Sequence, residues 1–423
     1  MNKQDLTLLT DLYELTMMQG YYKKGQHETV VFDVFYRHNP CGNGYSVCAG
    51  LDQVIDYIKN LNFTYEDVDY LRSLHIFDDD FLQYLSGFHF TGDIYAIPEG
   101  SVVFPKEPLL KVIAPIMEAQ LVETTILNLI NHQSLIATKT SRVVYAADGD
   151  GIMEFGLRRA QGPDAGLYGA RAAIIGGCVG TSNVLAGQLF DVPVMGTHAH
   201  SWIMTFPDEY TAFKYYAELY PDNCTLLVDT YDTLKSGVPN AIRVFQEFKD
   251  AGKPLKKYGI RLDSGDLAYL SKKARKMLDE AGFPDASICA SNDLDEYLLH
   301  DLKAQGAAIN SWGVGTHLIT SKDCPSFGGV YKLSAIKNEN GEFIPKIKIS
   351  ENTEKITNPG NKTIYRIYEK ETGKIKADLI CFADETFDES QDLLLFDPLE
   401  TWKKTKLAGG TYTMREMLIP IFK

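Results

Sequence analysis

Residues 259–281 read GIRLDSGDLAYLSKKARKMLDEA, and this pattern decides the fold. It begins with a short apolar strand, continues through a polar cluster at residues 263–266 and ends in an amphipathic helix. The same order of strand, polar or glycine cluster and helix recurs five or six times between residues 154 and 316. Such alternation is typical of a parallel α/β barrel, in which all strands end at one face. The repeat therefore predicts a barrel with a single mouth where the clusters meet.

The segments that flank the repeat predict a second domain. Residues 1–130 show a helical period near 5–22, an alternating strand at 29–37 and proline-broken strands between 92 and 113, and a long helical stretch at 118–142 leads into the barrel. Beyond residue 320, hairpin patterns such as NENGE at 338–342 predict strands that need a partner sheet. We expect residues 1–130 and 331–423 to form one composite α/β-sandwich domain, and residues 131–330 to form the catalytic barrel.

Composition and charge limit the classes of function. The net charge of −14 argues against broad nucleic-acid binding, because a phosphate backbone needs a basic face. The chain has no apolar run of about 18 residues and no secretory signal at its start, so we expect a cytoplasmic protein without a membrane partner. The seven cysteines form no Cys-x-x-Cys pair, which predicts reduced thiols and no fixed metal site made by the protein alone.

The cluster after residue 262 combines groups that bind anions and hydroxyls. Arg261 and Asp263 project to the same side of their strand, where they either pair with each other or contact a ligand. Ser264, Gly265 and Asp266 stand at the head of the following helix, where free backbone N–H groups bind an anion and a carboxylate binds a hydroxyl or Mg²⁺. We expect this cluster to contact an anion such as a phosphate.

Two further clusters favour phosphate binding. Gly313, Gly315 and Thr316 follow a strand and form a turn whose amides can surround a phosphate, although a tight turn alone is the other reading. Arg158 follows another strand end, and guanidinium groups bind phosphates through paired hydrogen bonds. Phe155 stands beside it, either to stack on an aromatic substrate ring or to fill the core.

His198 and His200 flank Ala199 just beyond a strand expected at residues 193–196. The pair has three readings: two metal ligands, core or capping histidines, and a phosphoryl acceptor, since imidazole can attack phosphorus and release the group again. The residues alone do not decide among them.

Taken in order, these clusters resemble the nicotinate phosphoribosyltransferase family. The motifs are TDLYELTM at 10–17, FYRHNP at 35–40, EFGLRRAQG at 154–162, GT-x-AHSW at 196–202, IRLDSGD at 260–266 and GVGT at 313–316. The resemblance implies an irregular, incomplete α/β barrel with an α/β-sandwich domain. It also implies an ATP-dependent, ligase-type reaction of nicotinate with 5-phosphoribosyl 1-pyrophosphate in NAD salvage, with Mg²⁺ bound to pyrophosphate and ATP.

The resemblance also implies roles for particular residues. It makes His200 the residue that ATP phosphorylates, and we expect Asp263 and Asp266 to steady the ribose or the metal. The expected nicotinate-binding residues are Tyr13, Phe155, Thr197 and Arg261. The expected phosphoribosyl pyrophosphate-binding residues are Arg37, Arg158, Ser264, Gly265, Gly313, Gly315 and Thr316. Because Tyr13 and Arg37 lie in the N-terminal domain, the resemblance implies a homodimer with the active site at its interface.

Two other functions fit the same pattern. A nicotinamide phosphoribosyltransferase shares the strand-end clusters, although the EFGLRRAQG and TDLY motifs favour the acid substrate. A barrel that binds a nucleotide or sugar phosphate without catalysis also fits. A barrel glycosidase needs two carboxylates across a sugar groove, and the arginine-rich mouth argues against it.

Overall fold

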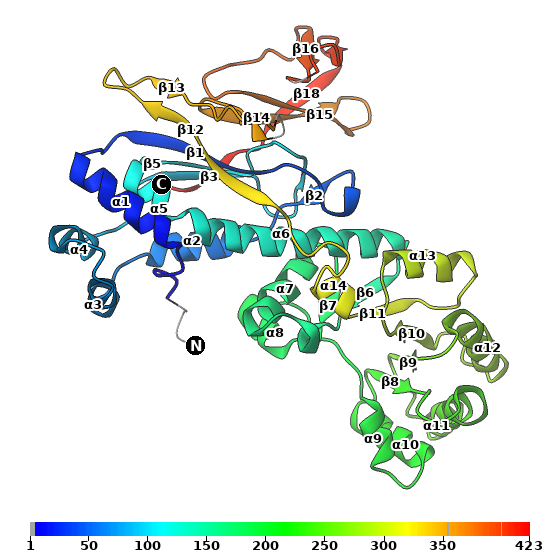
Figure 1. Cartoon of the computed structure of the whole chain (residues 1–423). Coiled ribbons are helices and arrows are strands. Elements are labelled where there is room, and N and C mark those ends of the chain that lie inside the picture. Colours follow the sequence, from blue (N-terminus) through cyan, green and yellow to red (C-terminus); the bar gives the residue numbers. More distant parts are fainter. Residues whose placement is uncertain (1–4, 353–354, 399) are drawn as a thin grey trace. The chain divides into compact units, whose positions relative to one another are not determined.

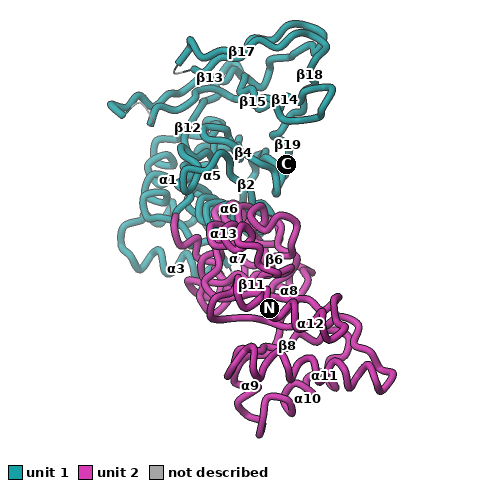
Figure 2. The backbone as a smooth tube through the Cα atoms, turned by 90° about the vertical axis from the view of Figure 1, so that its right-hand side faces the viewer, with its two compact units in different colours: residues 1–134, 326–423 teal, residues 135–325 magenta. Residues whose placement is uncertain are grey.

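The computed structural model describes residues 5–352, 355–398 and 400–423 (Figure 1). The chain divides into two compact units (Figure 2). Unit 1 comprises Met1–Ser134 and Ser326–Lys423, and unit 2 comprises Leu135–Pro325. Among the described residues, no helix has both the length and the apolar character needed to cross a bilayer.

Unit 1 is built around a six-stranded sheet with strands from both ends of the chain. The strand order is β13-β12-β1-β5-β3-β19, and each neighbouring pair is antiparallel. The bounds are β1 Thr29–Tyr36, β3 Asp93–Ala96, β5 Leu110–Pro115, β12 Gly329–Lys337, β13 Phe343–Pro345 and β19 Ile419–Phe422. The centre of β1 is buried, and the ring of its Phe32 stacks on Tyr331 of β12 with centroids 4.6 Å apart.

Helices and smaller sheets complete unit 1. The helices are α1 Leu12–Lys24, α2 Leu51–Asn60, α3 Tyr65–Ser73, α4 Asp79–Leu85, α5 Ile116–Leu121 and α6 Glu123–Ala146, the last of which continues into unit 2. The remaining strands are β2 Ser46–Val47, β4 Val102–Val103, β14 Lys362–Glu369, β15 Ile375–Phe382, β16 Leu393–Phe396, β17 Lys404–Leu407 and β18 Tyr412–Glu416. Strand β14 lies between β15 and β18 in a three-stranded sheet.

Buried ion pairs join β14 to its neighbours in unit 1. Lys362 contacts Asp33 of β1 at 2.7 Å, and Arg366 contacts Asp378 of β15 at 2.7 Å, with all four side chains almost fully buried. Removing one partner of such a pair costs about 3–5 kcal/mol, because the other charge is left buried. Nearby, burial and the carboxyl group of Asp378 raise the pKa of Glu107 far above its ordinary value.

Two helix boundaries differ from the sequence prediction. Helix α1 begins at Leu12 rather than near residue 5, because Thr7 donates its hydroxyl to the carbonyl of Asn62 and Asp11 takes the N-cap position in an extended conformation. The helix expected at 118–142 is two helices, α5 and α6, separated at Val122. At the start of α1, a contact distant in sequence thus overrides the local helical period.

Unit 2 contains a curled parallel sheet with the order β7-β6-β11-β10-β9-β8. The strands are β6 Gly151–Glu154, β7 Gly180–Thr181, β8 Cys224–Leu227, β9 Tyr258–Leu262, β10 Ser287–Ser291 and β11 Ser311–Val314. The helices are α7 Pro163–Ile175, α8 Val184–Phe190, α9 His200–Met204, α10 Glu209–Leu219, α11 Val238–Asp250, α12 Leu267–Glu280, α13 Glu296–Ala304 and α14 Thr316–Ile319. Strands β7 and β8 are the two edges of this sheet, so the barrel is incomplete.

The residue pattern explains how unit 2 folds. Helix α12 begins where the Asp266 carboxylate accepts a hydrogen bond from the Tyr269 N–H at 2.9 Å. Its buried residues, Leu267, Ala268, Ser271, Ala274 and Leu278, recur at helical spacing and cover the strands. The strands themselves are short and largely buried, as parallel strands covered by helices require.

Candidate active site

A cavity of about 430 Å³ lies at the carboxyl ends of the strands of unit 2. Its walls come from the loops after β6, β7, β9, β10 and β11 and from residues 196–199. Of the residues expected from the sequence, the cavity is lined by Phe155, Arg158, Thr197, Arg261, Asp263, Gly313, Gly315 and Thr316. The convergence of these side chains follows from the parallel strands, because all of their carboxyl ends point the same way.

Arg261 is the best-placed cation of the cavity. Its Nη1 donates to the Thr197 hydroxyl at 2.6 Å, and its Nε is buried with no hydrogen-bond partner among the described residues. Asp263 does not pair with it: the Asp263 carboxylate accepts a hydrogen bond from Ser291 and faces His200 instead. The guanidinium group of Arg261 therefore keeps donors for an anionic ligand.

His200, the first residue of α9, lies among polar partners from two loops, those after β8 and β9. Its Nδ1 is 3.0 Å from the Thr230 hydroxyl, and its Nε2 is 3.7 Å from Asp263 and 3.9 Å from Asp229. Its side chain is 38% exposed, so an incoming phosphoryl group can reach the ring. A histidine oriented by a hydroxyl and faced by carboxylates has the arrangement of an activated nucleophile.

Asp229 organises the loops around His200. Its side chain is only 2% exposed, and its Oδ2 accepts hydrogen bonds from the Asp263 N–H and the Ser264 hydroxyl, each at 2.7 Å. Its Oδ1 has no hydrogen-bond partner among the described residues and faces Nε2 of His200. The sequence prediction gave no role to Asp229, Thr230 or Ser291. The only available signal was that each stands at or within three residues of the carboxyl end of a strand.

His198 lines the cavity, whereas His200 lies beside it, and the two side chains have different surroundings. Its side chain is buried between residues of α10, with its ring 4.6 Å from that of Tyr216 in an edge-to-face contact. Its Nε2 accepts a hydrogen bond from the Leu227 N–H at 3.3 Å, and burial lowers its pKa to about 4. The two histidines thus have separate partners, which argues against the metal-pair reading.

The turn after β6 places Phe155 and Arg158. The buried carboxylate of Glu154 accepts hydrogen bonds from the Gly156 N–H and from the Thr181 hydroxyl, the latter at 2.6 Å, and burial raises the pKa of Glu154. The Phe155 ring lies against Gly313, where an added Cβ would come within 2.5 Å of the ring. Glycine at position 313 therefore leaves room for the aromatic side chain at the cavity wall.

Several expected residues lie outside this cavity. Asp266 uses one carboxylate oxygen to cap α12, Ser264 donates to Asp229, and Gly265 forms the intervening turn with a φ of 78°. Tyr13 and Arg37 belong to unit 1: Tyr13 is 44% exposed on α1, and the Nε of Arg37 is buried with no partner among the described residues. Their assignments to the site stay predictions.

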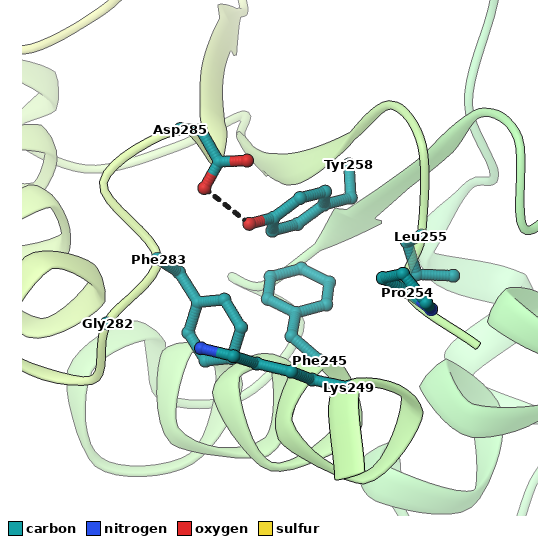
Figure 3. Close-up of a pocket in the computed structure, with 8 residues that line it drawn as sticks. All are labelled: Phe245, Lys249, Pro254, Leu255, Tyr258, Gly282, Phe283 and Asp285. Atoms are coloured by element: carbon teal, nitrogen blue, oxygen red, sulfur yellow. Dashed lines mark hydrogen bonds between the residues drawn. The ribbon is translucent and has the colours of Figure 1, made fainter. Parts of the chain in front are cut away.

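A second cavity, of about 260 Å³, lies at the amino ends of β9 and β10 (Figure 3). Three rings form its wall, those of Phe245, Tyr258 and Phe283. Its polar groups are already engaged, since the Tyr258 hydroxyl donates to Asp285 at 2.6 Å and the Lys249 ammonium lies over the Phe283 ring. The amino ends of barrel strands serve stability rather than catalysis, so the chemistry belongs to the first cavity.

The fold and the first cavity define the class: an α/β-barrel protein with a cationic cavity at the carboxyl ends of its strands. Three family models match the chain, namely the nicotinate phosphoribosyltransferase (NAPRTase) N-terminal domain at residues 8–131, the NAPRTase family at 151–372 and the NAPRTase C-terminal domain at 361–423. The chain belongs to the nicotinate phosphoribosyltransferase family, as its motifs predicted.

Individual relatives and a solved structure agree with this assignment. The chain is 52% identical over 398 residues to the nicotinate phosphoribosyltransferase of Bacillus subtilis, covering 94% of this chain and 80% of the relative. It is 39% identical over 495 residues to that of Caenorhabditis elegans, covering 100% of this chain and 86% of the relative. The crystal structure of human nicotinic acid phosphoribosyltransferase superposes with a TM-score of 0.82 at 30% identity, covering 97% of this chain and 88% of the other. The predicted incomplete α/β barrel is thereby confirmed.

Proposed function

We propose that the chain joins nicotinate to 5-phosphoribosyl 1-pyrophosphate, releasing pyrophosphate and nicotinate mononucleotide for NAD salvage. We further propose that ATP hydrolysis drives the reaction through a phosphorylated His200. The observation that carries the proposal is the position of His200, held by Thr230 and faced by two carboxylates, one of which lines the cavity that contains Arg261. Family membership and the names of the relatives support the choice of substrate.

The cavity suggests how the two substrates bind. The guanidinium group of Arg261, oriented by Thr197, would pair with the carboxylate of nicotinate, and the ring of Phe155 would stack on the pyridine. Arg158 and the amides of the turn that ends at Thr316 would hold the phosphates. Because a neutral amide cannot form the ion pair with Arg261, this arrangement favours nicotinate over nicotinamide.

The bond exchange at the sugar needs no protein base. The bond between ribose C1 and the pyrophosphate oxygen breaks, positive charge develops on the ring, and the lone pair of the pyridine nitrogen forms the new bond to C1. Asp263 would face the developing cation, and arginines would stabilise the departing pyrophosphate. The carboxylates of Asp229, whose Oδ1 is buried with no hydrogen-bond partner among the described residues, and of Asp263 would hold a Mg²⁺ ion, which when bound would neutralise diphosphate charge.

The ATP-dependent step would use the imidazole of His200. A ring nitrogen attacks the γ-phosphorus of ATP, the bond to the bridging oxygen breaks, and ADP leaves. The carboxylates of Asp229 and Asp263 would stabilise the positive charge that the ring gains. Water later attacks the phosphorus and releases inorganic phosphate together with free His200. While present, the phosphoryl group adds negative charge and acceptor oxygens beside the cavity.

We also propose a homodimer whose active site includes residues of both subunits. Each unit exposes apolar side chains: in unit 2, Val184 at 72%, Leu189 at 44% and Val194 at 49%, and in unit 1, Leu12 at 55% and Met17 at 39%. Where such side chains form a contiguous patch, they mark a protein–protein interaction site. If Tyr13 serves the partner's cavity, mixing inactive Tyr13→Ala and His200→Ala subunits will restore activity. A mixture as inactive as its components contradicts a shared site.

The deciding experiment measures phosphorylation and product together. The protein is incubated with ATP, the His200 peptide is examined for acid-labile phosphate by mass spectrometry, and nucleotide formation is assayed with nicotinate and with nicotinamide. His300, which is 78% exposed on α13, provides the control variant His300→Ala. We expect phosphate and ATP stimulation to be absent in His200→Ala and unchanged in His300→Ala. If His200→Ala keeps both the acid-labile phosphate and the ATP stimulation, His200 is not the phosphorylated residue. If the protein binds the substrates but forms no product, it is a non-catalytic barrel.

A further inference from the structure

The open side of the barrel sheet is bridged by residues 193–199. On one side this segment pairs with β7, through hydrogen bonds from the Thr181 N–H to the Pro193 carbonyl at 3.0 Å and from the Met195 N–H to the Thr181 carbonyl at 2.9 Å. The pairing is a single parallel bridge, rather than the strand expected at residues 193–196. Beyond Met195 the segment turns toward β8 without forming a strand beside it.

Strand β8 has one paired edge and one free edge. The N–H groups of Cys224 and Val228 donate to carbonyls of the β9 side, Lys257 at 2.8 Å and Arg261 at 3.2 Å. Successive N–H groups of a strand point to opposite edges, so the Leu227 N–H points to the free edge. There it donates to Nε2 of His198 at 3.3 Å. A side-chain nitrogen thus takes the place that a carbonyl of a neighbouring strand would occupy, and the buried N–H is satisfied.

This role requires a neutral imidazole with one particular tautomer. Because Nε2 accepts a hydrogen bond, the proton of neutral His198 is on Nδ1, which is buried and has no partner among the described residues. The ring is 8% exposed and lies edge-to-face on Tyr216. Burial keeps the ring in the form that can accept the hydrogen bond at neutral pH.

The residues on both sides of this hydrogen bond belong to the candidate active site. On the segment, Thr197 precedes His198 and orients Arg261, and His200 follows two residues later. On the strand, Leu227 is followed within three residues by Asp229 and Thr230, the two loop partners of His200. One side-chain hydrogen bond therefore links the loop that carries the nucleophile to the loop that orients it.

We propose that His198 is a positioning residue that closes the open side of the barrel and fixes His200 against Thr230 and Asp229. The kinetic part of this proposal rests on the proposed function, whereas the structural part does not. Displacing a reacting group by about 1 Å costs on the order of 100-fold in rate. The effect of His198 should therefore fall on the rate of phosphoryl transfer to His200 rather than on the affinity for ATP.

The test compares two replacements of His198. Glutamine can place an acceptor oxygen near the position of Nε2, whereas leucine fills a similar volume without an acceptor. We expect His198→Leu to speed hydrogen exchange at the Leu227 amide and to lower the single-turnover phosphorylation rate by at least about tenfold at saturating ATP, with the Kd for ATP unchanged. His198→Gln should restore much of the amide protection and of the rate. Thermal melting shows whether each variant folds.

The outcomes separate this proposal from the proposed function. If hydrogen exchange at the Leu227 amide is unchanged in a folded His198→Leu variant, His198 does not close the open side of the barrel and the proposal is overturned. If exchange rises but the phosphorylation rate stays within about threefold of the parent, the positioning role is wrong. If neither the parent nor any variant becomes phosphorylated, but hydrogen exchange at Leu227 still rises in His198→Leu, the proposed function is wrong and the structural role of His198 is supported. If His198→Leu does not fold, a His198→Gln variant that keeps the parental stability but leaves the Leu227 amide unprotected overturns the proposal.

Discussion

Replacing Asp229 by asparagine provides the sharpest test of the geometry around His200. The change keeps the shape of the side chain and removes its charge. Oδ1 of Asp229 lies 3.9 Å from Nε2 of His200. At an effective dielectric constant of about 20, a unit charge pair at this separation interacts by roughly 4 kcal/mol. Because the His200 side chain is 38% exposed, solvent screening reduces this figure to about 2 kcal/mol.

A loss of about 2 kcal/mol of transition-state stabilisation lowers the rate constant roughly 30-fold. The assay is single-turnover transfer of the γ-phosphoryl group from labelled ATP to the protein, followed by rapid quenching. Asp222→Asn is the matched control, because Asp222 is 69% exposed and pairs with Lys256 at the surface. We expect the control to transfer at the parental rate. If folded Asp229→Asn transfers within about threefold of the parent while His200→Ala transfers nothing, the electrostatic role of Asp229 is wrong.

Three further predictions concern binding, pH and packing. Arg261→Lys should raise the KM for nicotinate by about 10- to 100-fold, because lysine cannot reproduce a paired guanidinium–carboxylate contact. Steady-state assays with nicotinate and with nicotinamide check this, and an equal rise in KM for both substrates would contradict it. The raised pKa of Glu107 means that the folded protein binds this proton more tightly than the unfolded chain, so its contribution to stability is lost as pH rises out of the ordinary glutamate range. Glu107→Gln should therefore flatten the fall in melting temperature between about pH 6 and about pH 9, and an unchanged slope would count against it. Gly237→Ala should lower the free energy of unfolding by about 3 kcal/mol or more, because the added Cβ would lie 1.8 Å from the backbone carbonyl oxygen of Val228, directly after β8. Gly20→Ala, in open space on α1, should instead stabilise the protein slightly. Denaturant titration measures both changes.

The sequence determined those features that depend on local pattern. The strand, cluster and helix order of unit 2 predicted parallel strands and a cavity at their carboxyl ends, because periodicity and chain direction together fix which ends meet. The start of α12 was placed at Leu267, where the structure has it, since Asp266 is a favourable N-cap. Arg261, Asp263, Gly313 and Gly315 were placed in the cavity because each stands at or near the carboxyl end of a strand.

The local sequence pattern did not predict that residues of one motif have different roles. His198 and His200 are two positions apart, yet one is buried against α10 and the other is partly exposed beside the cavity. Asp266 stands in the same cluster as Asp263, but it caps a helix while Asp263 faces His200. These differences depend on which loops lie opposite each residue, and the sequence of the motif does not contain that information.

Thus the sequence by itself determined the family motifs, the barrel class and the set of polar residues that meet at the mouth. Only the tertiary structure decided that the barrel is open between β7 and β8, that Asp229 and Thr230 orient His200, and that His198 bonds to the free edge of β8. The physical reason is the range of the interactions. Hydrophobic period and capping act over a few residues, whereas strand register, such as the pairing of Leu227 with Arg261, joins residues far apart in the chain and sets which polar groups face each other.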